Sequence, residues 1–401
     1  MKVAVAGAGI GGLALALGAA RAGHEVVVCE RAAAIGEVGA GIQVSPNAAR
    51  ILDRWGLRQQ FERIAVHPSR IVIRRWSDDS ELRSITLGEA CAARFGHRYA
   101  NVHRHDLVSL LAGPIGEQAG VTLRFGDGVV GVERGAEGCG AALLLSDGSA
   151  VEADVVVGAD GIHSAVRSML FGATPSRFSG AVAYRALVPR ERVAHLPVEV
   201  TNRLGPDRHV VTYLVGPGGR WLNLVCVVPE ASWDLESWTE QGSVDALRAE
   251  FEGWSSELAA VLEQVEAPVH RWALHDRPPL ERWSDGAATL LGDACHPMLP
   301  FMAQGACQAI EDAAVLVACL GELPAAPAHD AVAAALRRYE GARLARTATV
   351  QRLSWHNRVL YHLPDGDEQA DRDRAYRSGG DDLAAFDWLY GHDVDGDRPS
   401  S

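Results

Sequence analysis

The first thirty residues carry the feature that most constrains the fold. An apolar run over residues 3–6 is followed at once by Gly7-x-Gly9-x-x-Gly12, an Ala/Leu-rich segment and a second apolar run ending in Glu30. Glycines at this spacing between a strand and a helix are typical of a dinucleotide-binding βαβ unit, because they allow a tight turn, close approach of a pyrophosphate and close helix packing. A carboxylate ending the second strand binds adenosine ribose hydroxyls and repels a 2′-phosphate. The pattern therefore favours FAD or NAD over NADP.

Two later stretches place carboxylates at the ends of apolar strands. Residues 155–159 lead into Asp160-Gly161, and residues 288–291 lead into Gly292-Asp293. The carboxyl ends of parallel strands share one edge of a sheet, where such folds bind ligands. We therefore expect Asp160 and Asp293 to lie near the glycine loop. Asp160 has a second, compatible interpretation as the N-cap of a helix from Ile162 onwards.

The segment after Asp293 predicts a loop that opens a helix. Pro297 and Pro300 exclude helix from the loop, and an apolar helical pattern begins at about Ala303. Backbone N–H groups at Gly305 and Ala306 then fall in the first turn, where the helix dipole favours an anion or an electron-rich carbonyl.

The rest of the chain predicts an α/β protein with an inserted sheet. Residues 178–230 read as antiparallel strands of a separate layer, residues 245–265 as one amphipathic helix, and residues 328–360 as one or two packing helices. The expected fold is a Rossmann-type FAD-binding domain with an inserted antiparallel β-sheet substrate domain and C-terminal helices. The predicted division is 1–68, 102–177 and 268–325 for the FAD-binding domain, 69–101 and 178–267 for the substrate domain, and 326–401 for the C-terminal segment.

Composition limits the partners. The net charge of −13 argues against nucleic acid or an anionic membrane surface as a partner. Seven cysteines show neither Cys-x-x-Cys nor zinc-ligand spacing, so we expect no metal and reduced thiols in a cytoplasm. No apolar run reaches the ~18 residues that span a bilayer, and the chain starts directly with a strand rather than a leader.

Together the three motifs, in this order, resemble the single-component FAD-dependent aromatic hydroxylases, a group that includes salicylate hydroxylase, 3-hydroxybenzoate 6-hydroxylase and 6-hydroxynicotinate 3-monooxygenase. The resemblance covers nearly the whole chain. It implies a monooxygenase that uses FAD, NADH (or NADPH) and O2 to hydroxylate a small aromatic compound through a flavin hydroperoxide, as a monomer or homodimer. NADH is expected over NADPH. The cofactor-binding residues that it implies are Gly7, Gly9, Gly12, Glu30, Arg31, Arg104, Asp160, Asp293, Pro300, Gly305 and Ala306.

The expected substrate pocket lies between the 178–230 layer and residues 295–302. His209 and Tyr213 stand four apart on one predicted strand and so share a face. They resemble the His/Tyr pair that meets the phenol in the family, where a base makes the ring electron-rich. Gln43, Pro300 and Phe301 depart from residues that relatives carry, so no particular substrate is assigned. The sequence alone leaves two alternatives: an oxidase or reductase of the same fold without oxygen insertion, and a non-catalytic dinucleotide-binding regulator.

Overall fold

The structure, a computed structural model, describes residues 1–36, 41–116, 118–135, 140–233, 241–380 and 383–394. The N-terminal motif lies in a six-stranded sheet of order β18-β19-β11-β1-β2-β7, in which all neighbours pair in parallel except β18 and β19. Its strands are β1 (Lys2–Ala6), β2 (Glu25–Glu30), β7 (Val121–Phe125), β11 (Val155–Gly158), β18 (Ser284–Asp285) and β19 (Ala288–Leu290).

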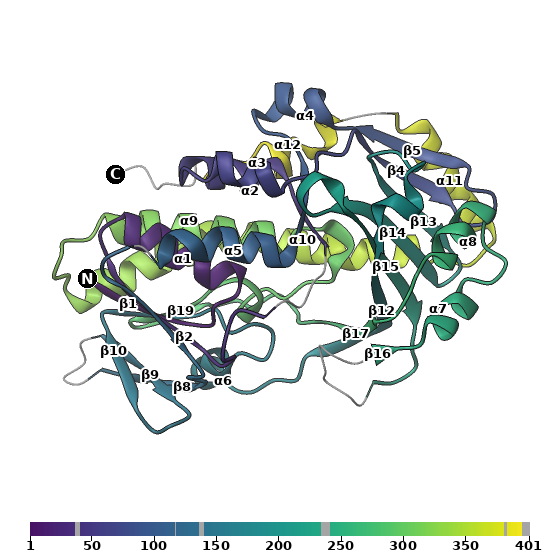
Figure 1. Cartoon of the computed structure of the whole chain (residues 1–401). Helices are drawn as coiled ribbons and strands as arrows, with labels where there is room; N and C mark the ends of the chain where they lie inside the picture. The colour runs from purple at the N-terminus through teal and green to yellow at the C-terminus, as the bar shows by residue number, and fades with distance from the viewer. Residues whose placement is uncertain (37–40, 117, 136–139, 234–240, 381–382, 395–401) are drawn as a thin grey trace.

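Helices cover one side of this sheet and a small sheet covers the other (Figure 1). The helices are α1 (Ile10–Arg21), α5 (Arg104–Ile115) and α9 (Gly305–Gly321), and the small antiparallel sheet consists of β8 (Val129–Arg134), β9 (Ala141–Leu145) and β10 (Ala150–Ala153). Because β1 and β11 are buried on both faces, their sequences are continuously apolar rather than alternating. A short ribbon of β3 (Gly41–Val44) and β6 (Ala100–His103) leads away from the sheet.

The second large sheet has eight strands in the order β16-β17-β12-β15-β14-β13-β4-β5. Its strands are β4 (Arg70–Arg75), β5 (Glu81–Thr86), β12 (Arg177–Pro189), β13 (Val200–Gly205), β14 (Arg208–Val215), β15 (Trp221–Pro229), β16 (Gln241–Gly242) and β17 (Val269–Asp276). All neighbours pair antiparallel except β13 and β4. Strand β17 belongs to this sheet, although the predicted domain boundary at residue 268 assigned it to the FAD-binding part.

One face of the eight-stranded sheet is covered by α7 (Val244–Glu250) and α8 (Ser256–Glu263), which share a core with Val182 and Leu224. The single helix expected over 245–265 is therefore wrong: Gly253 adopts φ of 81°, a left-handed conformation that breaks the helix. The opposite face, which we call the inner face, packs Val225 and Val227 against Leu299 and Phe301.

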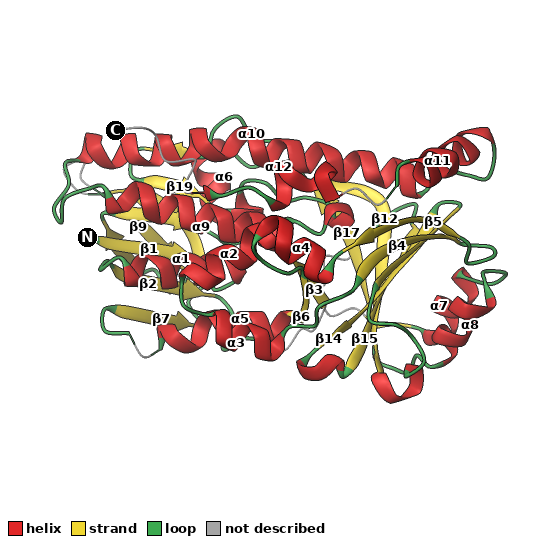
Figure 2. Cartoon of the chain, turned by 90° about the horizontal axis from the view of Figure 1, so that it is seen from above, coloured by secondary structure: helices red, strands yellow, loops and turns green. Residues whose placement is uncertain are grey.

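Helix α10 (His329–Tyr361) joins the two halves. It runs along the molecule from beside β19 to α11 (Asp367–Ser378), as Figure 2 shows, so the predicted segment 328–360 is one helix. The remaining helices are α2 (Pro46–Arg54), α3 (Arg58–Ile64), α4 (Gly88–Phe95), α6 (Ala165–Phe171) and α12 (Asp387–Tyr390). In the part of the chain that is described, none of the helices is both long and apolar enough to cross a bilayer.

Candidate active site

The three sequence motifs meet at one edge of the parallel sheet. A methyl carbon built on Gly7 would lie 2.5 Å from the carbonyl oxygen of Ala159, and one built on Gly11 would lie 2.5 Å from a methyl group of Leu291. Gly7 also has φ of 98°, which only glycine adopts readily. The turn after β1 is thus packed against the ends of β11 and β19, as the parallel-strand argument predicts.

The two remaining glycines of the fingerprint have different surroundings. A methyl carbon on Gly12 would lie 2.0 Å from the carbonyl oxygen of Gly7, so this position sets the close packing of helix on strand. At Gly9 no described atom lies within 4 Å of such a carbon, and φ is −74°. The backbone there is open to a ligand, which is the property that a pyrophosphate needs. These residues fit the phosphates of FAD.

Glu30 is held at the end of β2. Its Oε2 accepts a hydrogen bond from the Ala8 N–H at 2.8 Å, and its Oε1 accepts one from the Ala32 N–H at 2.9 Å. The carboxylate is therefore fixed beside the glycine loop with lone pairs left for ribose hydroxyls. Arg31 is exposed, and its side chain lies alongside Gly128.

Asp160 follows β11. One carboxylate oxygen accepts hydrogen bonds from the N–H groups of Ala165 at 2.8 Å and Val166 at 3.3 Å, whereas the other is buried with no described partner. Burial raises the pKa of Asp160, against the lowering effect of these hydrogen bonds. Helix α6 begins at Ala165 and not at Ile162, and its N-cap is Ser164. Asp160 adds to that cap and keeps one oxygen for a ligand.

Asp293 and Arg104 influence each other electrostatically. Burial raises the pKa of Asp293, and the charges of His296 and Arg104 oppose the shift. Burial lowers the pKa of Arg104, while Asp293 and Glu30 oppose it. Asp293 is surrounded by buried neighbours in the chain, yet it is itself solvent-exposed. Both groups are therefore available to a ligand that extends from Glu30 towards Asp293.

Helix α9 begins at Gly305, and Gly305 and Ala306 are partly exposed. Their N–H groups have no partner within the helix, and the Asp293 carboxylate lies 4.0 Å from a methyl carbon built on Gly305. Pro300, which is exposed, precedes this helix. These positions fit the flavin ring, because a helix N-terminus stabilises negative charge on it.

Helix α10 holds the loop in front of α9. Its side chains donate to successive loop carbonyls: Gln351 to Pro297 at 3.0 Å, Ser354 to Leu299 at 2.8 Å and Asn357 to Phe301 at 3.1 Å. The loop thus has a fixed position opposite the inner face of the eight-stranded sheet.

His209 and Tyr213 lie on that inner face, as their spacing predicts, but have different neighbours. His209 Nδ1 is 2.7 Å from His362 Nε2, and its ring centroid is 5.2 Å from that of Phe301. Burial holds the pKa of His209 well below its usual value, so the ring is neutral near pH 7. Tyr213 packs against Gly41. Burial raises its pKa to about 12, opposed by Arg185 and a hydrogen bond with Gln43.

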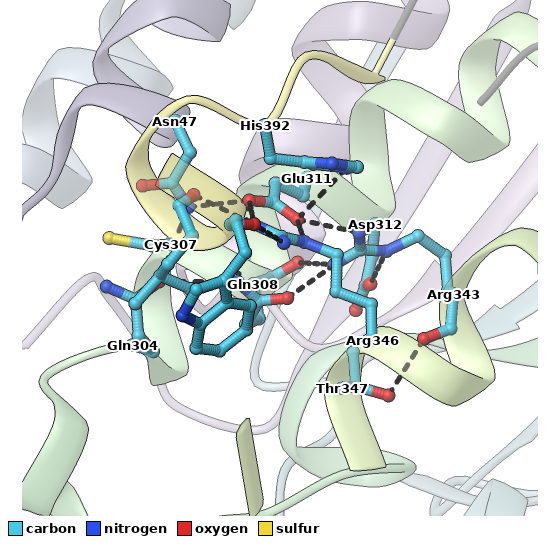
Figure 3. A network of polar contacts seen from close by, with 12 residues as sticks. Asn47, Gln304, Cys307, Gln308, Glu311, Asp312, Arg343, Arg346, Thr347 and His392 are labelled. Carbon is cyan, nitrogen blue, oxygen red and sulfur yellow. Dashed lines mark hydrogen bonds and ion pairs between the residues drawn. The ribbon is translucent and has the colours of Figure 1, made fainter. Parts of the chain in front are cut away.

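Side chains of α9 and α10 form a buried ionic network next to the turn that carries Asp293 (Figure 3). Asp312 accepts hydrogen bonds from the Gly292 N–H at 3.0 Å, His296 Nε2 at 2.5 Å and Arg343 Nε at 2.8 Å. It therefore fixes both ends of the turn that carries Asp293. Cys295 and His296 lie close enough to Asp312 to suggest a metal site, but the carboxylate is already occupied by these donors.

Sequence reasoning missed four residues of this region: Arg185, Asn223, His362 and Asp312. Asp312 and His362 carry no local motif. Arg185 did leave a signal, since it shares one face of its strand with Ala181, Ala183 and Leu187, and an arginine in such an apolar stripe calls for a ligand or a partner.

An open glycine turn, a ribose-binding acid and a helix N-terminus together make an FAD-binding site, which places the chain among the flavin-dependent enzymes. Comparison with known proteins agrees. Residues 1–354 match a family described as "FAD binding domain", and the chain belongs to this family.

Curated relatives extend over nearly all of the chain. It is 41% identical to 3-amino-4-hydroxybenzoate 2-monooxygenase PtmB3 of Streptomyces platensis over 98% of this chain and 96% of the relative. It is 38% identical to 6-hydroxynicotinate 3-monooxygenase of Bordetella bronchiseptica over 90% of this chain and 92% of that relative. Among solved structures, Klebsiella pneumoniae HpxO complexed with FAD and uric acid has a TM-score of 0.83 and 27% identity over 95% of this chain and 93% of that one. The enzyme is thus an aromatic hydroxylase that uses FAD and a reduced nicotinamide.

Proposed function

We propose that the enzyme hydroxylates a small aromatic acid that carries a ring hydroxyl, with the substrate bound on the inner face of the eight-stranded sheet. The observation that carries this proposal is the pair His209 and Tyr213 on that face. The ring centroid of Phe301, in the loop before α9, lies 5.2 Å from that of His209. The relatives act on 3-amino-4-hydroxybenzoate and 6-hydroxynicotinate, which share this chemistry.

The cofactor is held by the residues described above. Gly9 leaves room for its pyrophosphate, in the turn that Gly7 and Gly12 shape. Glu30 binds its ribose, and Arg104, Asp160 and Asp293 line its length. Pro300, Gly305 and Ala306 border its ring, and Arg31 stands outside at the adenosine end. FAD held there would supply the redox chemistry that links the reduced nicotinamide to O2. One oxygen atom enters the ring, the other leaves as water, and NADH supplies two electrons.

The chain's own contribution to the oxygen-insertion step is a proton acceptor. Burial lowers the pKa of His209, which keeps the ring neutral near pH 7 and able to accept a hydrogen bond from a ring hydroxyl and relay its proton. Loss of that proton raises the electron density of the ring where oxygen attacks. His362, whose pKa is lowered to about 3 by burial and by the charge of Arg358, stays neutral beside it and orients the ring.

The reduced nicotinamide has a candidate docking site beside Asp160. A surface pocket of about 310 Å³ is lined by His163, Arg167, Ser168, Thr174, Pro175, Ser176, His275 and Arg277. It has basic and hydroxyl side chains and no carboxylate among its lining residues, which suits a dinucleotide's phosphates. The cytoplasmic location and the choice between monomer and homodimer stay predictions.

The test is a substrate panel on the FAD-loaded enzyme: 3-amino-4-hydroxybenzoate, 6-hydroxynicotinate, 3-hydroxybenzoate and salicylate. The proposal expects at least one acid to accelerate NADH oxidation and to yield a product with one added oxygen by mass spectrometry. Acceleration by none of the four, with FAD bound, would refute it.

A further inference from the structure

We propose that Arg185, assisted by Asn223, binds the carboxylate of the aromatic acid and thereby selects acids over neutral phenols. This deepens the proposed function and rests on it. Arg185 lies on the inner face of the eight-stranded sheet, in register with Val225.

The strand register places Arg185 beside the predicted substrate position. Arg185 pairs with Val225, and Val225 pairs with Val211, so these three residues form one row across β12, β15 and β14. The row lies between the row of Tyr213 and the row of His209. Val211 and Val225 thus form an apolar surface, the valine floor, that faces Leu299 and Phe301 of the loop and has Arg185 at its edge.

The guanidinium of Arg185 has no anion to balance it among the described residues. It stacks on the Trp272 ring with its central carbon 4.5 Å from the ring centroid, and its Nε is buried without a hydrogen-bond partner in the described part of the chain. Burial lowers its pKa, Tyr213 opposes the shift, and the second cation, Arg104, adds to it.

Two buried arginines of this protein are paired with carboxylates instead. Arg343 contacts the carboxylates of Glu311 and Asp312, and Arg203 contacts that of Asp79. A desolvated cation without such a partner is costly. A ligand carboxylate at Arg185 supplies the missing anion, and the planar fork of a guanidinium matches it with two parallel hydrogen bonds.

Asn223 provides a second donor next to this position. Its Oδ1 accepts a hydrogen bond from the Gly41 N–H at 2.9 Å, which orients the amide. Its Nδ2 is then left buried and without a partner among the described residues. Because Leu187 pairs with Asn223, Arg185 and Asn223 are diagonal neighbours on adjacent antiparallel strands, about 7–8 Å apart between Cα atoms. Two buried donors without partners among the described residues therefore lie on adjacent strands, one in the row of Val225 and one in the row of Tyr213.

This arrangement also orients the substrate. His209 lies on the row beyond Val225, at the other end of the floor from Asn223. A carboxylate at Arg185 and Asn223 directs the opposite side of the ring, with its hydroxyl, towards His209. The same enzyme should then bind a carboxamide analogue poorly, since the amide carries no charge and presents N–H groups to donors.

The experiment compares the most active acid of the four-member panel with its carboxamide, in the wild type and in the Arg185→Met, Arg185→Lys and Asn223→Ala variants. The Kd and the kcat/KM of NADH-dependent hydroxylation are measured on FAD-loaded protein. Arg185→Met should weaken acid binding on the order of 10- to 100-fold and leave the carboxamide unchanged. Arg185→Lys should recover part of the loss, because lysine keeps the positive charge but lacks the two parallel N–H donors of a guanidinium.

Arg177→Met is the matched control. Arg177 lies on the same strand and also stacks on a tryptophan, with its central carbon 3.8 Å from the Trp355 ring centroid, but it is paired with Asp276. It should keep the preference for the acid. An Arg185→Met enzyme that still prefers the acid as strongly as wild type would overturn the inference while leaving the proposed function intact. A wild type that turns over no acid refutes both.

Discussion

His209 Nδ1 lies 2.7 Å from His362 Nε2, and the two residues are separated by 153 positions in the chain. One ring nitrogen must donate and the other accept, so the pair is stable only while at least one ring is neutral. Burial lowers the pKa of both rings. The second nitrogen of His209 takes no part in this contact, and the first prediction concerns its role.

His209→Ala should impair oxygen insertion more than cofactor reduction. Hydride transfer does not need an electron-rich ring, whereas hydroxylation does, and loss of a general base typically costs about 10²–10⁴-fold. We expect continued NADH oxidation with hydrogen peroxide released in place of product, and Tyr213→Phe to act in the same direction more weakly. Stopped-flow measurement of the two half-reactions separates the effects, with the exposed His195→Ala as control. Unchanged coupling in the His209 variant would remove this residue from the mechanism.

Gly9→Val should abolish FAD retention without unfolding the protein. The φ of Gly9 suits valine, and no described atom lies within 4 Å of the added carbon, so the side chain occupies only the space predicted for the pyrophosphate. Gly12→Val, in contrast, should prevent folding, because its first carbon would meet a carbonyl oxygen at 2.0 Å. Flavin absorbance after gel filtration and thermal unfolding of the apoprotein check both. Full flavin content in the Gly9 variant would contradict the assignment.

Arg343→Met should strongly destabilise the fold. Arg343, Glu311 and Asp312 have fully buried side chains, and the substitution leaves two carboxylates without this partner. Breaking a buried ion pair in this way costs about 3–5 kcal/mol. Arg338→Met on the same helix breaks the partly exposed pair with Glu322 and should cost less than about 1 kcal/mol. Denaturant unfolding gives both values, and equal losses would show that the network adds no special stability.

Glu311 should contribute to acid sensitivity. Burial alone would raise its pKa, but the charge of Arg343 and hydrogen bonds from Arg346 overcome burial and lower it to about 2, from 4.5. A folded-state pKa below the unfolded one gives stability that is present above the unfolded pKa and lost as pH falls through the folded one. Unfolding free energy should thus decline between about pH 5 and about pH 2. A Glu311→Gln variant should show a shallower decline, and an identical pH profile would speak against this.

The parts of the site that could be predicted are those encoded by contiguous residues. The glycine turn and Glu30 form one local pattern, and Asp160 and Asp293 follow from the rule that parallel strands share an edge. Arg185, Asn223 and His362 could not be assigned in this way, because their positions depend on which strands pair and on where α10 ends. The helix expected over 245–265 failed because a continuous amphipathic pattern hid the left-handed Gly253.

For His209 and Tyr213, the shared face could be predicted from the sequence, but the neighbours of the two side chains could not. Their four-residue spacing predicts a shared face, and the structure has them on the inner face of β14. The spacing contains nothing about the partner of His209 across the molecule or about Gly41 beneath Tyr213. Long-range packing determined both, and it also sets their pKa shifts.

The central claim, that this chain inserts oxygen from O2 into an aromatic acid, is tested most directly by isotope labelling. The FAD-loaded enzyme is supplied with NADH and the best acid of the panel under ¹⁸O2, and the product is analysed by mass spectrometry. We expect one ¹⁸O atom on the ring for each NADH consumed in coupled turnover. Oxidised NADH with an unaltered aromatic acid, or a product whose new oxygen comes from water, would contradict it.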